Sequence, residues 1–417
     1  MFFRAPLASI VFSAIFFPLL SGIVVVLTQA QAQAPAPAPA PAPTPTPICQ
    51  PSVNFPVTVA SPAQRLAAGN KAQPPVTDFN NFFAWPDTPM SLIKTTTGYE
   101  FFASDGGLHA RQLWQGHYVG NNKWGSVVTT LGTLNNPLGS GDPQDVSISP
   151  NPDPSVNPNY PSYVYMGGGP VYQVPAGMAG AGNLLLVYHG ELPYDSLYAV
   201  LGLAASSDNG LHWTDLGEII RLNQAYTTGL DGFEIGDGPL VLSPDGKYFY
   251  LYFPDWIANG TPHRTTTTNV SVARALASSV LDAAFGSTRQ HTVSFEKFYK
   301  GNWHLQPAIG GASTDLNPKS QYQGYLDIHF NTALQRYVMI ISNDTTFAYA
   351  ESVDGLSWTL PTSLGDQSTI AAYPTAVGLG DDPHVLGKSF YVYFTHLPND
   401  GTVWVNGSLR RLTLTCP

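Results

Sequence analysis

Short runs of β-branched, aromatic and leucine residues dominate the hydrophobic pattern of this chain. Examples lie at residues 99–104, 184–189, 248–253 and 337–342, and Gly, Pro, Asn or Asp residues stand between successive runs. Short apolar runs bounded by turn residues are typical of β-strands, whereas amphipathic helices show a longer period. The pattern therefore predicts an all-β chain with few helices.

The runs fall into five successive sets of short strands, as the blades of a β-propeller would. The expected strands are 91–94, 99–104, 111–118 and 124–130 in blade one, 171–174, 184–189, 199–205 and 213–221 in blade two, 240–243, 248–253, 270–275 and 295–299 in blade three, 325–330, 337–342, 347–351 and 358–360 in blade four, and 385–386, 390–395 and 408–415 in blade five. Because blade five lacks one strand, we expect the segment after Cys49 to supply it and close the ring. Residues 276–291 are left open between a short helix and a long loop.

One turn sequence occurs twice, as SSDNGLHW at residues 206–213 and as ESVDGLSW at residues 351–358. The Asp can accept backbone N–H bonds within its own loop, the Gly permits a positive φ, and the Trp can fill the space between sheets. The first form resembles the Asp-box turn of β-propellers such as sialidases. The shorter second form resembles the equivalent turn of five-bladed glycosidases such as glycoside hydrolase family 43. The spacing suits two blades, since a blade with long loops takes roughly 40 to 75 residues.

The two cysteines of the chain, Cys49 and Cys416, stand near the two ends of the strand-rich region. In an oxidising compartment such a pair is expected to form one disulfide. A propeller brings its two ends together when it closes its ring, and the disulfide would lock that closure. The predicted fold class is therefore all-β, a single five-bladed β-propeller over residues 48–417.

The N-terminus has the features of an export signal. A basic start at residues 1–4 precedes an apolar run at 5–27, and Ala30 and Ala32 frame an AxA-like cleavage site. Residues 1–32 are thus expected to be a signal peptide, although the apolar run is long enough to serve as a membrane anchor instead. Residues 33–47 read as an extended Ala/Pro-rich linker. The protein is expected to be secreted or extracytoplasmic.

Charged residues make up 11% of the chain, and 18 Lys and Arg stand against 28 Asp and Glu. No basic stripe is available to neutralise phosphates, so nucleic acid is not an expected partner. The resemblance of the second turn to that of five-bladed glycosidases makes carbohydrate the expected partner. No membrane contact is expected beyond the possible anchor, and the protein is expected to be a monomer.

An acidic residue recurs where the innermost strand of each blade is expected to begin. The instances are Asp87 in PDTPM, Asp237 in GDGPL, Asp327 in YLDIHF and Asp382 in DDPHV, whereas blade two has GGGPV. Inner strands surround one axis, so their heads should meet at one mouth of the central channel. Carboxylates that approach each other raise one another's pKa, which can keep one group protonated as an acid beside an ionised base. Each Asp alone could instead cap a strand entry by accepting backbone N–H bonds.

Residues 80–415 resemble the five-bladed propeller glycosidases that act on arabinan, xylan and related glycans. The resemblance implies that Asp87 is the general base or nucleophile and that Glu234, in DGFEIGDGP, is the general acid, with Asp237 as its neighbour and rival. Blade two departs from the pattern because no acid precedes its inner strand. Asp145 and Glu191 are the candidates to replace that acid.

Several residues are candidates for contact with sugar. His189 and Glu191, near the end of a blade-two strand, could bond sugar hydroxyls or form a satisfied pair at the strand edge. Trp85, Trp256 and Trp303 could stack on sugar rings, although Trp residues more often pack between blades.

One position raises the question of a metal ion. His384 follows Asp382, and some five-bladed arabinan hydrolases hold an axial calcium with a His in this region. A hydrogen-bonded Asp–His pair is the alternative, so calcium at the propeller axis stays open and no other cofactor is expected.

Two functional classes follow. The first is a glycosidase with Asp87, Glu234 or Asp237, and Asp327 around one pocket. The second is a non-catalytic carbohydrate-binding propeller that lacks the blade-two acid. A sialidase is disfavoured, because the Arg residues do not stand at blade positions suited to gripping a substrate carboxylate.

Overall fold

The computed structural model describes residues 48–54, 57–60, 88–104, 127–137, 144–146, 148–163, 165–192, 198–223, 233–236, 238–258, 264–287, 293–317, 325–342, 346–366, 370–397 and 408–417. The chain divides into Met1–Pro43 and a compact unit, Thr44–Pro417, to which all of these residues belong. Among them, no helix is both long and apolar enough to cross a membrane.

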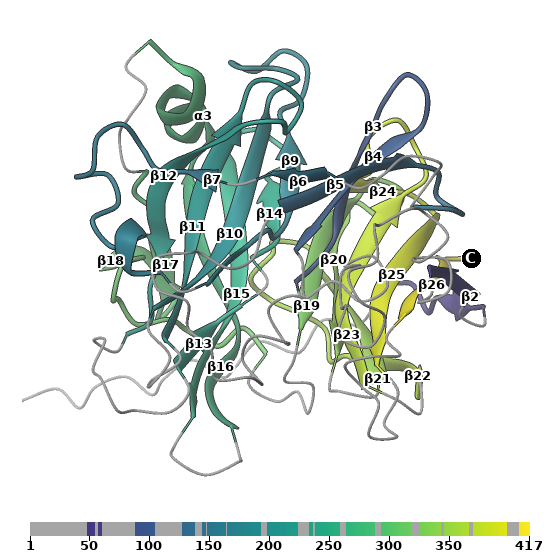
Figure 1. The fold of residues 1–417 in the computed structure, drawn as a ribbon. Helices are drawn as coiled ribbons and strands as arrows, with labels where there is room; N and C mark the ends of the chain where they lie inside the picture. The colour runs from purple at the N-terminus through teal and green to yellow at the C-terminus, as the bar shows by residue number, and fades with distance from the viewer. Residues whose placement is uncertain are drawn as a thin grey trace, which may run out of the picture. The chain divides into compact units, whose positions relative to one another are not determined.

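The compact unit is a five-bladed β-propeller, as the hydrophobic pattern predicts (Figure 1). Its blades are antiparallel sheets whose strands follow one another from the channel outward. Blade one contains β3 (Ser91–Lys94), β4 (Tyr99–Ser104), β5 (Val127–Gly132) and β6 (Gln144–Val146), and blade two contains β9 (Val171–Gln173), β10 (Leu184–Leu192), β11 (Tyr198–Ser206) and β12 (Trp213–Ile220).

Blades three to five follow the same plan. Blade three contains β14 (Leu240–Leu242), β15 (Tyr248–Ala258), β16 (Arg264–Leu276), β17 (Glu296–Tyr299) and β18 (Asn302–Pro307), blade four contains β19 (Leu326–Asn331), β20 (Arg336–Ser342), β21 (Thr346–Ser352) and β22 (Thr362–Asp366), and blade five contains β23 (Ile370–Gly378), β25 (Ser389–Leu397) and β26 (Ser408–Thr415).

Short elements complete the blades. The helix α3 (Ala277–Phe285) resolves the open choice for residues 276–291 in favour of a helix. β7 (Ile148–Ser149) pairs with β12, β8 (Tyr165–Gly167) pairs with β10, and a 3-10 turn, η1 (Tyr160–Ser162), lies between them. β13 (Phe233–Ile235) pairs with both β11 and β15 and so joins blades two and three into one sheet.

The ring closes as expected from the two cysteines. β1 (Ser52–Val53) and β2 (Val57–Ala60) both pair with β26, the last strand of the chain, and supply the outer edge of blade five. A disulfide joins Cys49 to Cys416 across a Cα–Cα distance of 5.5 Å. The two termini of the propeller are thus tied both by strand pairing and by a covalent bond.

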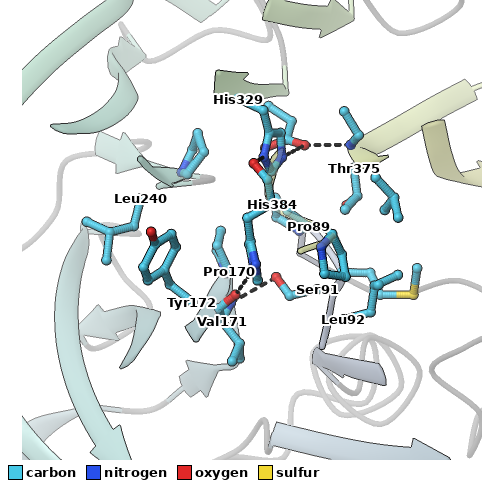
Figure 2. A pocket seen from close by; sticks show the side chains of 16 residues that line it. Pro89, Ser91, Leu92, Pro170, Val171, Tyr172, Leu240, His329, Thr375 and His384 are labelled. Carbon is cyan, nitrogen blue, oxygen red and sulfur yellow. Dashed lines mark hydrogen bonds and ion pairs between the residues drawn. The ribbon is translucent and has the colours of Figure 1, made fainter. Parts of the chain in front are cut away.

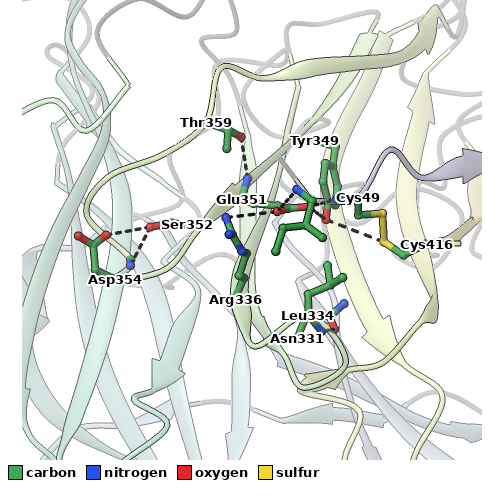
Figure 3. Close-up of polar contacts among 12 residues, drawn as sticks. Cys49, Asn331, Leu334, Arg336, Tyr349, Glu351, Ser352, Asp354, Thr359 and Cys416 are labelled. Carbon is green, nitrogen blue, oxygen red and sulfur yellow. Dashed lines mark hydrogen bonds and ion pairs between the residues drawn. A yellow bond between two sulfur atoms is a disulfide. The ribbon is translucent and has the colours of Figure 1, made fainter. Parts of the chain in front are cut away.

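A buried carboxylate reinforces this closure (Figure 3). Glu351, at the end of β21, accepts hydrogen bonds at Oε1 from the Cys49 amide (2.8 Å) and the Tyr349 hydroxyl (2.9 Å). Its Oε2 accepts the Ile48 amide at 2.9 Å and lies 3.7 Å from Arg336. Blade four therefore holds the chain where it enters blade five.

Three predictions of strand position need correction. In blade one, β4 pairs directly with β5, so no strand from residues 111–118, which lie outside the described residues, separates them. In blade four, the fourth strand is Thr362–Asp366, and Trp358 forms only an isolated bridge to Ser352. The turn after Trp358 therefore takes more residues than the hydrophobic pattern indicates.

The third correction concerns the inner strand of blade five, which is β23 and not residues 385–386. β23 contains Pro374, and its pairing with β25 shifts register between Ala372 and Thr375. Pro has no backbone N–H to donate, so it enters a strand at such an irregularity, and the sequence there reads as a loop. Residues 385–386 form β24 (Val385–Leu386), which pairs in parallel with β19.

Candidate active site at the channel mouth

The five inner strands, β3, β9, β14, β19 and β23, line one central channel. Pro89, Pro170 and Pro239 stand just before β3, β9 and β14 and line the same cavity. We call the end of the channel at which the inner strands begin the channel mouth. The cavity has a volume of about 20 Å³, which accommodates about one water molecule. A sugar ring is larger and does not fit inside this cavity.

Two of the expected catalytic residues, Asp87 and Asp237, lie outside the described residues, as does Trp85. Their chain neighbours are described. Thr88, directly after Asp87, is buried, and its hydroxyl donates a short hydrogen bond to the carbonyl oxygen of Gly168. The heads of blades one and two are therefore in contact at the mouth.

Glu234 lies on β13, where it pairs with Trp256 of β15. The side chains of these two residues are outside what the structure describes. The pairing places both residues at the edge where blades two and three join. This edge also carries Asp255, which pairs with Ile235.

Blade two contributes His189 and Glu191 near the end of β10. His189 pairs with Gly167 and Glu191 with Tyr165 across β8 and β10. The His189 Nε2 lies 3.3 Å from Glu191 Oε1, and both side chains are largely buried. Gly168, next after β8, bonds the head of blade one, so this His–Glu pair lies beside the chain segment that carries Asp87. The side chain of Asp145, the other candidate for the blade-two acid, is not described.

Asp327 lies on the channel wall, but its carboxylate is already bonded within the protein (Figure 2). Oδ1 accepts the Ile328 amide at 3.0 Å, and Oδ2 accepts the Ala376 amide of β23 at 2.6 Å. His329 Nε2 lies 2.8 Å from the same Oδ2. The arrangement joins blade four to blade five and is the strand-capping alternative that the sequence left open for this Asp.

His329 faces hydrogen-bond acceptors at both ring nitrogens. Its Nδ1 lies 2.9 Å from the backbone oxygen of His384, and its Nε2 faces Asp327. Burial lowers the pKa of His329, but the Asp327 carboxylate, the His384 carbonyl and the Asp382 charge together raise it above the ordinary value. Acceptors at both ring nitrogens favour the imidazolium form, which would place a positive charge opposite Asp327.

Asp382 and His384 lie in the connection between β23 and β25 rather than at the head of an inner strand. His384 Nε2 lies 2.7 Å from the Val171 carbonyl oxygen of blade two, and its Nδ1 lies 3.2 Å from Asp382 Oδ1. Burial raises the pKa of Asp382, but hydrogen bonds and charge from His384 and the charge of His329 hold it below its usual value. With both ring nitrogens facing oxygens of the protein, this arrangement of His384 does not fit direct coordination of calcium. No group of three or more His, Cys, Asp or Glu within the described ranges could hold a metal ion.

Trp303 is separate from the mouth. It lies on β18, the outermost strand of blade three, where the Arg274 guanidinium packs 4.2 Å from its ring centroid and Phe298 lies at 5.1 Å. The structure does not bring Trp303 together with the other predicted sugar contacts.

Several channel and edge residues have roles that sequence reasoning missed. His329 stands two positions after Asp327, and in a strand such residues share one face, so the pattern DIH carried a signal. Thr375 lines the channel, and its buried hydroxyl has no hydrogen-bond partner within the described residues.

Lys297 and Asp255 form a buried pair with an Nζ–Oδ2 distance of 3.7 Å. Burial lowers the pKa of Lys297 to about 8 and raises that of Asp255.

Comparison with known proteins gives only distant likenesses. No protein-family model and no curated sequence matches the chain. Similar solved structures include the catalytic domain of a GH62 alpha-L-arabinofuranosidase from Coprinopsis cinerea, with 11% identity over 88% of this chain and 97% of that one and a TM-score of 0.49. An alpha-L-arabinofuranosidase from Podospora anserina shares 9% identity over 88% and 98%, with a TM-score of 0.47. A family 117 glycoside hydrolase from Zobellia galactanivorans shares 14% identity over 81% and 87%, with a TM-score of 0.44. At this level of similarity, any statement about the activity of this chain rests on its own residues.

Proposed function

We propose that the protein is a secreted glycoside hydrolase that cleaves a poly- or oligosaccharide at the channel mouth by two-carboxylate acid/base chemistry. One observation carries the proposal. Pro89, Pro170 and Pro239 line the same cavity, and Asp87 and Asp237 each stand two residues before their proline. Two residues of chain span at most about 7 Å, so we expect both carboxylates near the mouth.

In blade two, the position two residues before the proline holds a glycine instead of an acid. The residue two before Pro170 is Gly168, whose carbonyl oxygen instead bonds Thr88. Glu191 is the blade-two carboxylate nearest to this head along the pairing of β8 with β10. We assign Glu191 the place of the missing acid, with His189 as its hydrogen-bonding neighbour.

The proposed roles are those that the resemblance to five-bladed propeller glycosidases implies. Asp87 acts as the ionised base or nucleophile, and Glu234 or Asp237 acts as the general acid. The negative charge of Glu191 would favour the protonated form of that acid, because like charges raise each other's pKa. The Cys49–Cys416 disulfide supports export, since such bonds persist in oxidising compartments.

The test is release of reducing sugar from arabinan, arabinoxylan, xylan and β-1,3-galactan by the whole chain. We expect activity on at least one of them, and a loss of roughly 100-fold or more in Asp87→Asn and in either Glu234→Gln or Asp237→Asn. Asp245→Asn is the matched control, because Asp245 is an exposed residue of the β14–β15 turn in the same blade as Asp237. Equal activity in Asp87→Asn and Asp245→Asn would refute the assignment.

The alternative is a non-catalytic carbohydrate-binding propeller. Two observations favour this alternative. The Asp327 carboxylate already accepts hydrogen bonds from two backbone amides, and blade two has Gly168 at the position where blades one and three have an Asp. Both leave fewer carboxylates available for catalysis. Binding to one of the four polysaccharides without release of sugar would support this alternative and exclude the hydrolase.

A further inference from the structure

A second pocket is lined by residues from the outer part of blade two and from α3, two elements that lie on the same side of the propeller (Figure 1). The turn at residues 206–213 opens onto it. β11 runs from Tyr198, opposite Leu192 at the mouth-side end of β10, to Ser206, opposite Leu184. The pocket and the channel cavity share no lining residue, so they are distinct places.

The polar side of this pocket is an Asp–His pair. Asp208 Oδ1 accepts the Ser206 hydroxyl at 2.8 Å and the His212 amide at 3.0 Å, and its Oδ2 lies 2.6 Å from His212 Nδ1. Although burial raises the pKa of Asp208, the hydrogen bonds from His212 and Ser206 lower it to about 2. In the neutral ring, the Asp208 carboxylate favours the proton on Nδ1, which leaves His212 Nε2 as a hydrogen-bond acceptor. The side chain of His212 is 87% exposed.

The turn itself does not need a histidine at this position. In the second turn, Ser357 occupies the place of His212, directly before the Trp. Its amide donates to Asp354 Oδ1 at 2.7 Å and its hydroxyl to Oδ2 at 3.2 Å, so a serine satisfies the same carboxylate. The imidazole therefore adds something beyond the stability of the turn, and it does so where the turn borders a pocket.

The rest of the pocket combines an apolar wall with hydrogen-bond acceptors. Ala205, Leu216, Ala284 and Phe285 contribute apolar surface, and the pocket has a volume of about 280 Å³. This size is close to the lower end of ordinary ligand pockets, roughly 300 Å³. Ala284 and Phe285 also belong to the last turn of α3, and a helix C-terminus carries partial negative charge. Together with the Asp208 carboxylate, this favours ligands that donate hydrogen bonds and disfavours anions.

We propose that this pocket, the blade-two pocket, binds one ring of a neutral sugar. Ring hydroxyls donate to Asp208 and His212 Nε2, and the apolar face of the ring lies against Phe285 and Leu216. Uronic or sulfated sugars are excluded by the carboxylate and the helix end. The inference rests on the proposed function for its ligand class, since a glycan held here would stay attached while the mouth acts on another part of it.

The first test is a titration followed by NMR of the histidine rings. D-galactose, L-arabinose and D-xylose are added separately to the whole chain, with D-galacturonate as the anionic comparison. The Hε1 signal of His212 is assigned by its loss in His212→Ser, which installs the residue of the second turn. We expect a saturable shift of this signal with at least one neutral sugar and none with galacturonate. An unmoved signal, or an equal response to galacturonate, would overturn the proposal.

The second test is affinity electrophoresis through gels containing arabinan, arabinoxylan, xylan or β-1,3-galactan. We expect His212→Ser and the pocket-filling variant Thr214→Trp to weaken retardation at least tenfold in one of these gels. Release of sugar from short aryl glycosides should stay at the wild-type rate in both variants. Asp87→Asn should lose hydrolysis but should still be retarded in the gel. Loss of hydrolysis therefore tests the proposed catalytic residue, and loss of retardation tests the blade-two pocket. Undiminished retardation in both pocket variants would count against the site.

Discussion

At the scale of single residues, Gly202 shows how closely the blade-two strands are packed. Tyr188 lies opposite Gly202 across β10 and β11 and is fully buried. Its hydroxyl donates to Asp215 Oδ1 at 2.8 Å and accepts from Asn157 at 3.0 Å. The ring thus crosses its partner residue to reach a buried carboxylate, and this path is open only because position 202 has no side chain.

Gly202→Ala should therefore be strongly destabilising. A Cβ at this position would lie 1.9 Å from the Tyr188 ring, so the ring must move and its hydrogen bonds to Asp215 and Asn157 are lost. Overpacking of this kind costs about 1–3 kcal/mol of unfolding free energy. Gly387→Ala is the control, because nothing lies within 4 Å of its added Cβ. Denaturant unfolding of the two variants checks the prediction, and equal midpoints would contradict it.

At the scale of elements, the inner strands are joined across the channel by a chain of hydrogen bonds (Figure 2). Ser91 Oγ accepts the Val171 amide at 2.8 Å, and the Val171 oxygen faces His384. The His384 oxygen in turn faces His329, which pairs with Asp327. These hydrogen bonds connect blades one, two, four and five, in addition to the pairing of β24 with β19. Because this chain of hydrogen bonds passes through His329, whose pKa is raised, its strength depends on pH.

The contribution of His329 to the stability of the propeller, measured as the difference between wild type and His329→Asn, should fall as pH rises above neutrality. Lys297, whose pKa is lowered to about 8, contributes a change of the opposite sign to both proteins. His329 has a raised folded pKa, so its contribution is fully present below the unfolded value of 6.5 and is lost as pH rises through the folded pKa. Asp327, Asp382 and His384 are the titratable or charged groups that face it. Thermal unfolding followed from pH 6 to 9 measures the effect.

The matched variants are His329→Asn and His304→Asn. The first should remove most of this pH dependence, and the second should keep it, because His304 is an exposed residue of the outermost blade-three strand. A pH profile that is the same for wild type and His329→Asn would contradict the role of the imidazolium.

At the scale of the whole molecule, blades two, three and four were predicted mostly to within a few residues because turn residues bound their strands clearly. The inner strand of blade five could not be predicted in this way. Pro374 enters β23 where its pairing with β25 shifts register, and the local sequence does not show that the neighbouring strand accommodates a proline there. The same limit applies to the site. The position of Asp327 on an inner strand was predictable, but its bond to the Ala376 amide joins two blades and follows only from their packing.

The largest whole-molecule effect should come from opening the ring. The disulfide closes a sequence separation of 367 residues, and in the chain-entropy model so long a loop stabilises the folded protein by about 5 kcal/mol. Replacing both Cys49 and Cys416 with Ser should lower the melting temperature, although β1 and β2 still pair with β26 and Glu351 still accepts the amides of residues 48 and 49. Reductant should lower the melting temperature of the wild type to that of the double variant and leave the double variant unchanged. If the wild type melts at the same temperature with and without reductant, strand pairing and Glu351 alone hold the ring closed.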